Sequence, residues 1–212
     1  MTIHDPTRGR YVHTVKQYYE ELWERLPDDL APPDQELRRR FAQAHVGPGD
    51  RVLDLGCGIG DLAAELARAG AHVTAADVAQ AALDRAARRH PELHLRLIAI
   101  DEPLPFDDGS LDAVWSSEVI EHVADTARWL SEVRRVLVPR GRVLLTTPSH
   151  GRLRLLAGGI ERYSEPLGDH LHLYTARSLR EVLREFGFGE IEVQARAGLP
   201  LARRLLLARA VR

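Results

Sequence analysis

The chain has 212 residues, 44% of them hydrophobic, and a formal net charge of −2 at pH 7. This length and composition suit one globular domain with a sizeable core, and the charge gives no global basic field for nucleic acid. The single cysteine, Cys57, excludes an internal disulfide framework and a cysteine-rich zinc site.

The first 45 residues predict a helical cap. Apolar and aromatic residues such as Val15, Tyr19 and Leu22 recur at helical spacing and indicate a helix over 11–26. Prolines follow and must end that helix, and a second helix is expected over 34–45. The arginine run Arg38-Arg39-Arg40 within it is expected to be a solvated helix face.

From residue 46 onward, the pattern alternates between strand and helix. The expected strands cover 51–55, 71–76, 93–100, 111–116, 142–147, 189–196 and 203–211, and the expected helices cover 61–69, 80–89, 124–137 and 176–186. Such a βαβ series predicts an α/β domain with a mostly parallel sheet and helices on both faces. We therefore expect one domain over 1–212. Its N-terminal helical cap covers 1–45, and its core covers 46–212 with a substrate-side insertion at 148–173, since long connections are often functional.

The run Asp54-Leu55-Gly56-Cys57-Gly58-Ile59-Gly60 joins the first core strand to the first core helix. Glycine lets the backbone pass close to a bound ligand where a Cβ would collide. The helix N-terminus beyond the turn offers unpaired N–H groups to an anionic group. We expect a nucleotide-like ligand here, although Gly60 comes one place earlier than the third glycine of a dinucleotide fingerprint.

This pattern resembles the first motif of class I methyltransferases that use S-adenosylmethionine. The resemblance implies a Rossmann-like sheet of seven strands with the last one antiparallel. It also implies that Asp54 lies near the ammonium group of the ligand, and that the backbone of Gly56, Cys57, Gly58 and Gly60 faces the ligand.

Two acidic positions after later strands are the next cofactor candidates. Asp77, with the adjacent Val78, ends the second strand, where an acid can accept hydrogen bonds from both ribose hydroxyls. The alternative for Asp77 is a cap on the following helix. Asp101 and Glu102 precede a Leu-Pro-Phe segment that resembles the adenine-side loop of the family. The alternative for this pair is an exposed acidic turn.

The exit of the fourth strand supplies the remaining candidates. Ser117 should face the methionine portion of the ligand, because ligands of open α/β sheets bind at the carboxyl ends of strands. If a helix begins at Glu118, then Glu118, Glu121 and His122 share one face, which can bind a divalent cation. This motif resembles the metal motif of small-RNA 3′-terminal 2′-O-methyltransferases, which add a later histidine, and of ubiquinone-pathway O-methyltransferases. His170 is the candidate for that later histidine.

We assign no metal ligand from these residues, and a bound divalent metal is an alternative that the sequence does not favour. His122 and His170 are instead the catalytic candidates, as a general base or an orienting donor. A purely structural role for both histidines is the third alternative.

These motifs predict a methyltransferase that uses S-adenosylmethionine, releases S-adenosylhomocysteine, and acts on an oxygen, nitrogen or carbon nucleophile of a small molecule. The alternatives are a metal-assisted RNA 2′-O-methyltransferase and a non-catalytic methyltransferase-like binding protein. No apolar run approaches the length of a membrane span, and residues 1–20 lack a secretory apolar core. A cytoplasmic protein is expected, and the sequence indicates neither the acceptor nor the oligomeric state.

Overall fold

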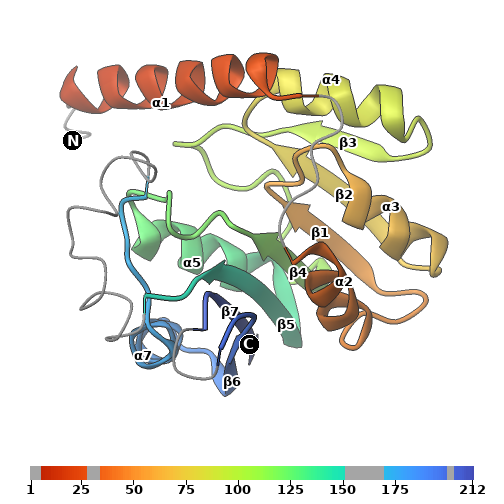
Figure 1. Ribbon diagram of the computed structural model, residues 1–212, viewed down its shortest axis with the longest axis vertical. Coiled ribbons are helices and arrows are strands. Elements are labelled where there is room, and N and C mark those ends of the chain that lie inside the picture. The colour runs from red at the N-terminus through yellow and green to blue at the C-terminus, as the bar shows by residue number, and fades with distance from the viewer. Residues whose placement is uncertain (1–5, 28–33, 151–169, 200–202) are drawn as a thin grey trace.

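The computed structural model describes residues 6–27, 34–150, 170–199 and 203–212, and this part of the chain forms one seven-stranded sheet (Figure 1). The strands are β1 (Arg51–Leu55), β2 (His72–Asp77), β3 (His94–Leu97), β4 (Leu111–Ser117), β5 (Leu137–Pro148), β6 (Gly189–Arg196) and β7 (Leu205–Val211). Their order across the sheet is β3-β2-β1-β4-β5-β7-β6. Neighbours among β1 to β5 pair in parallel, and β7 runs antiparallel to both β5 and β6. The expected Rossmann-like, mostly parallel sheet is therefore confirmed.

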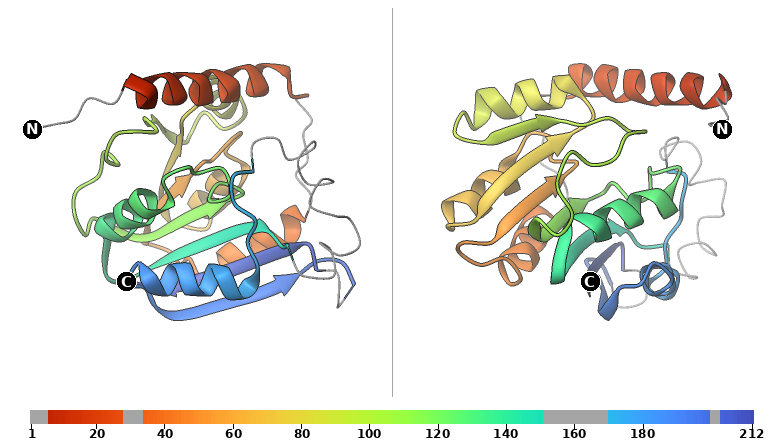
Figure 2. Two further views of the ribbon diagram at one scale, coloured as in Figure 1. Left: turned by 90° about the vertical axis from the view of Figure 1, so that its left-hand side faces the viewer. Right: turned by 180° about the vertical axis from the view of Figure 1, so that it is seen from behind.

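Helices cover both faces of the sheet (Figure 2). They are α1 (Pro6–Arg25), α2 (Gln35–Gln43), α3 (Asp61–Arg68), α4 (Gln80–Arg89), α5 (Thr126–Val136) and α7 (Ala176–Glu185). One core layer packs α2 and α3 against β1 and β2 through residues such as Ala42, Leu66 and Val52. The other packs α5 and α7 against β1, β4 and β5 through residues such as Leu53 and Leu130. Alternate side chains of the central strands β1, β2, β4 and β5 contribute to both layers, as two-sided burial requires.

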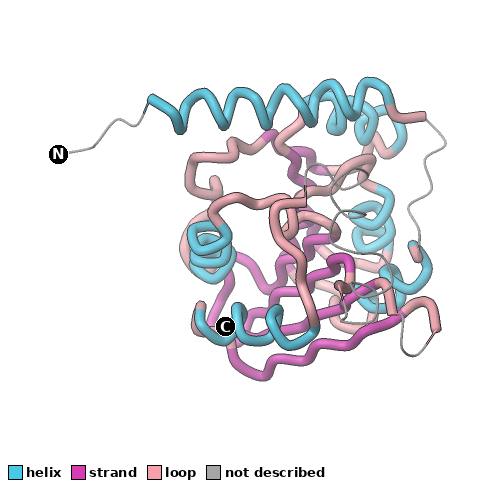
Figure 3. Tube along the Cα trace, turned by 60° about the vertical axis from the view of Figure 1, so that its left-hand side comes forward, coloured by secondary structure: helices cyan, strands magenta, loops and turns pink. Residues whose placement is uncertain are grey.

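Helix α1 lies across one end of the molecule, beside α4 (Figure 3). Its carboxylate Glu20 accepts hydrogen bonds from the backbone N–H groups of Gln80 and Ala81, at 2.8 and 2.9 Å. These are among the unpaired donors at the start of α4, so Glu20 satisfies a helix N-terminus from another element. Arg85 of α4 also donates to the carbonyl of Leu26, just beyond the end of α1.

Helix α2 is held against the C-terminal strand. Asp34, the residue before the helix, accepts two hydrogen bonds from Arg204, at 2.7 and 2.9 Å. Such a two-point contact fixes orientation as well as distance.

The strands differ little from their predicted bounds, with two exceptions. β3 ends at Leu97, and the connection over 98–110 contains no helix or strand. β5 begins at Leu137, earlier than expected, with a register shift opposite Leu111 and Ala113. Most of the predicted insertion, 151–169, lies outside the described residues, so the predicted domain bounds stay a prediction.

Among the residues placed by the structure, no helix is both long and apolar enough to cross a bilayer. The cytoplasmic location stays a prediction.

Candidate functional site

A cavity of about 690 Å³ opens at the carboxyl ends of β1, β2 and β4, beneath α1 and α2. Predicted cofactor residues among its lining are Asp54, Gly56, Cys57, Gly58, Asp77, Val78, Asp101, Glu102 and Ser117. This is the position at which open α/β sheets bind ligands, and the volume is ordinary for a small-molecule site.

The glycine turn forms the floor of this cavity. Gly58 has a φ of 53°, and a Cβ there would lie 2.8 Å from the Trp23 ring of α1. Gly60 does not line the cavity, and a Cβ on it would come within 2.8 Å of Leu93. Its lack of a side chain permits close packing of the turn against α4 and its C-terminal loop, and its predicted contact with a cofactor stays a prediction.

Two buried acids, Asp54 and Asp77, lie next to the turn, and only 3% and 6% of their surfaces are exposed. Burial, with the neighbouring charge of Asp77, raises the pKa of Asp54 to about 7. Burial also raises the pKa of Asp77, opposed by hydrogen bonds from backbone N–H groups. Paired buried carboxylates favour a cation or hydroxyl donors as their ligand.

Asp77 combines both predicted roles. Its two carboxylate oxygens accept hydrogen bonds from the N–H groups of Gly58 and Ala79, each at 3.0 Å. The carboxylate therefore supports the start of α4 and holds the glycine turn, and it still faces the cavity.

The other cofactor candidates are less enclosed. Asp101 and Glu102 are exposed, as an acidic turn would be, yet both line the cavity. The hydroxyl of Ser117 forms a 2.7 Å hydrogen bond with the hydroxyl of Thr146 on β5.

The predicted helix over 124–137 begins later than the motif of acids and histidine requires. Residues 118–125 form a turn, and α5 starts at Thr126. The condition of a helix from Glu118 is not met, because Asp125 caps α5 by accepting a hydrogen bond from the N–H of Arg128 at 3.0 Å. Glu118 itself has a φ of 55°.

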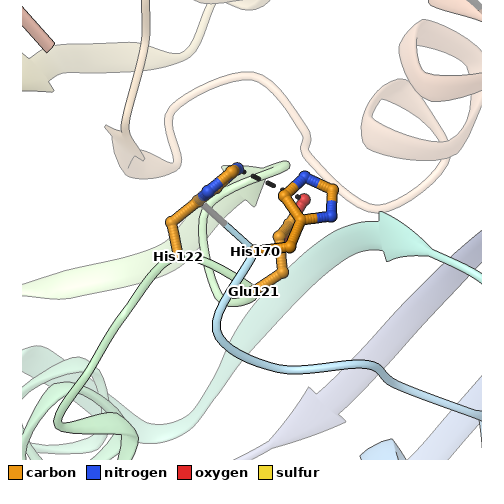
Figure 4. A group of neighbouring side chains, drawn as sticks. All are labelled: Glu121, His122 and His170. Carbon is orange, nitrogen blue, oxygen red and sulfur yellow. Dashed lines mark ion pairs between the residues drawn. The ribbon is translucent and has the colours of Figure 1, made fainter. Parts of the chain in front are cut away.

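The turn nevertheless gathers Glu121, His122 and His170 (Figure 4). One ligand atom from each lies within 4.8 Å of the other two, and the two imidazole centroids are 4.6 Å apart. The backbone explains the approach of His170, since the next two N–H groups, of Leu171 and His172, donate to the carbonyl of Glu121. His122 lines the cavity, while Glu121 and His170 lie behind it.

Glu121 is fully buried. One carboxylate oxygen accepts a 2.9 Å hydrogen bond from the hydroxyl of Thr147. The other, Oε1, lies 3.8 Å from Nε2 of His122 and receives no hydrogen bond within the described parts of the chain. Burial, followed by the charge of Glu118, raises the pKa of Glu121 to about 8. A carboxylate oxygen beside two imidazoles is a donor set that suits a divalent metal.

The sequence-based interpretation missed Arg38. Its side chain is only 11% exposed and lines the cavity, whereas Arg40 is 74% exposed. The solvated-face expectation is therefore wrong for Arg38. A signal was present, because Arg38 lies one helical turn before the buried Ala42, on the inner face of α2.

Comparison with known proteins decides the family, since a family model described as "Methyltransferase domain" matches residues 11–193. The chain belongs to the methyltransferase domain family. A glycine/sarcosine/dimethylglycine N-methyltransferase of Actinopolyspora halophila is 30% identical over 86% of this chain and 37% of its own length. A ubiquinone biosynthesis O-methyltransferase of Alkalilimnicola ehrlichii is 33% identical over 68% of this chain and 60% of its own length.

Among solved structures, phosphoethanolamine N-methyltransferase 2 of Haemonchus contortus, in complex with S-adenosyl-L-methionine, superposes with a TM-score of 0.72. The two are 21% identical, over 96% of this chain and 58% of that one. This methyltransferase chain spans 37%, 30% and 47% of the length of the first three curated relatives. Membership and the structural likeness confirm the expected methyltransferase family and its class I fold.

Proposed function

We propose that this methyltransferase transfers a methyl group from S-adenosylmethionine to a nucleophilic oxygen, nitrogen or carbon of a small molecule. The observation that carries the proposal is the cavity at the strand ends, which joins the glycine turn to the buried acids Asp54 and Asp77. The names of relatives that act on glycine, sarcosine and phosphoethanolamine support a small acceptor.

The charges around the cavity suit each part of this cofactor. Asp54 would bind the ammonium group, whose positive charge keeps the carboxylate ionised despite its burial. Asp77 would accept the ribose hydroxyls, and Asp101 the adenine amine. Arg38 would bind the carboxylate of the methionine portion, because its guanidinium lines the cavity and can pair with both oxygens of a carboxylate.

The reaction needs little covalent help from the protein. The acceptor attacks the methyl carbon, and the electron pair of the breaking bond goes to sulfur. Alignment of donor and acceptor in a water-poor cavity supplies much of the acceleration. Where the acceptor loses a proton, His122 can take it, because it lines the cavity with Tyr19 nearby. His170, behind it, would orient the His122 ring.

The test is transfer of an isotopically labelled methyl group to a panel of small amines, phenols and carboxylic acids, with short RNAs as the comparison. We expect transfer to at least one small molecule and none to RNA. Binding of S-adenosylhomocysteine without transfer to any acceptor would favour the non-catalytic alternative.

The second candidate is a metal-assisted methyltransferase, favoured by the buried Oε1 of Glu121 beside two imidazoles. Glu121, His122 and His170 would hold the ion. A divalent metal there would lower the pKa of an acceptor hydroxyl. The net charge of −2 disfavours RNA as the acceptor.

Removal of metal separates the two candidates. The protein is dialysed against chelator, and binding of Mg²⁺, Mn²⁺, Co²⁺ and Zn²⁺ is measured by calorimetry. The metal-assisted candidate requires that the protein bind a metal ion stoichiometrically. Glu121→Gln should abolish this metal binding, and Glu185→Gln, an exposed control, should preserve it. Full activity in chelator would exclude it.

A further inference from the structure

The side chain of Arg38 is fixed in place, but its guanidinium is only partly paired. It cannot easily withdraw, because Arg204 holds Asp34, the residue before α2, by two hydrogen bonds. The buried Nε–H of Arg38 donates a hydrogen bond to none of the described residues. The N–H donors of a guanidinium lie in one plane, and a carboxylate pairs with them best when each of its two oxygens accepts a hydrogen bond.

The anionic partner of Arg38 in this structure is Glu118, and the contact is a poor one. A single pair of atoms, Nη2 and Oε2, meets at 3.3 Å. The other oxygen of Glu118 accepts a 3.1 Å hydrogen bond from the hydroxyl of Thr146. Glu118 also adopts a left-handed backbone conformation, with a φ of 55°, which is uncommon for a residue of this type and costs free energy.

We propose that Glu118 is an internal substitute for the ligand carboxylate on Arg38, and that the cofactor displaces it on binding. This inference rests on the proposed function, since it takes the methionine carboxylate as the group that arrives. That carboxylate can approach the guanidinium with both oxygens, whereas Glu118 is already engaged by Thr146. Glu118 leaves Arg38 and stays on Thr146.

Binding measurements on Glu118→Gln test the exchange. The probes are S-adenosylhomocysteine and S-adenosyl-3-thiopropylamine, which lacks only the carboxylate. While Glu118 occupies Arg38, only a fraction of the protein is competent to bind, and the apparent affinity falls by that fraction. Removal of the Glu118 carboxylate should therefore tighten S-adenosylhomocysteine binding by about three- to tenfold. Affinity for the amine probe should stay within about twofold. Loss of a negative charge near the ammonium would instead weaken both.

Three further variants complete the test. Glu102→Gln removes another cavity carboxylate, and we expect it to leave the preference between the probes unchanged. Glu118→Asp keeps the charge but shortens the reach to Arg38, so it should also tighten S-adenosylhomocysteine binding, and it replaces the glutamine variant should that one fail to fold. Arg38→Gln should weaken S-adenosylhomocysteine binding and spare the amine probe.

The outcomes separate the two proposals. If the wild-type protein binds neither probe, the proposed function fails. If it binds S-adenosylhomocysteine through Arg38 but neither Glu118 variant binds more tightly, the exchange alone is wrong.

Discussion

At the scale of single residues, Asp77 uses the same two oxygens for the fold and for the proposed ribose site. Each oxygen already accepts one backbone N–H, from Gly58 and Ala79. A carboxylate has about four lone-pair sites, so both oxygens can accept a second donor from a ligand.

Asp77→Ala should weaken S-adenosylhomocysteine binding by roughly 1–3 kcal/mol, because charged hydrogen bonds are lost. It should also lower the melting temperature, since two buried N–H groups lose their acceptor. Calorimetry measures both quantities, and Asp77→Asn, which keeps one acceptor oxygen, should lose less stability. Unchanged ligand affinity in Asp77→Ala would show that the ribose assignment is wrong.

The raised pKa of Asp54 predicts that the stability of the ligand-free protein depends on pH. Its pKa rises from 3.8 to about 7 on folding, so folding takes up a proton. This contribution to stability is complete below the unfolded pKa and is lost as the pH rises through about 7. Asp54→Asn removes the dependence.

We therefore expect Asp54→Asn to melt at a higher temperature than the wild type at pH 8, with a smaller difference at pH 5, while it binds S-adenosylhomocysteine less tightly. Scanning calorimetry across this pH range measures the effect, with the exposed Asp101→Asn as control. A lower melting temperature for Asp54→Asn at pH 8 would contradict the assignment.

At the scale of elements, the sequence predicted best what depends on local pattern. The strand, glycine turn and helix around Gly58 formed as expected, because apolar alternation and backbone freedom act within a few residues. The helix predicted over 124–137 begins at Thr126, close to its expected start, because Asp125 caps it there. The helical spacing of Arg38 and Ala42 indicates the buried face of α2, whereas the pairing of Arg38 with Glu118 joins distant segments and has no local pattern.

Helix α1 carries a prediction of its own, since it lines the cavity and is joined to α4 by Glu20. Glu20→Gln should weaken that contact by about 1–2 kcal/mol. Dissociation of S-adenosylhomocysteine should then be about tenfold faster, as measured by stopped-flow fluorescence. Glu21→Gln is the matched control, because the hydrogen bonds of Glu21 to described residues come from the exposed side chains of Gln17 and Arg25 on α1 itself. Equal dissociation rates in the two variants would mean that α1 does not limit ligand release.

At the scale of the whole molecule, ligand binding should stabilise the fold. A ligand at about one hundred times its Kd adds about 2.7 kcal/mol, which for a chain of this size raises the melting temperature by about 5–10 °C. We expect this shift with S-adenosylhomocysteine and none with NADH, measured by differential scanning fluorimetry. A larger shift with NADH would overturn the cofactor assignment.

Cys57 gives this protein a built-in reporter of cavity occupancy. It is the only thiol of the chain and lines the cavity beside the glycine turn. Burial raises its pKa well above the usual value, so the thiol is protonated and a weak nucleophile at neutral pH. An alkylating reagent would mark one site per molecule, and a ligand in the cavity would protect that site.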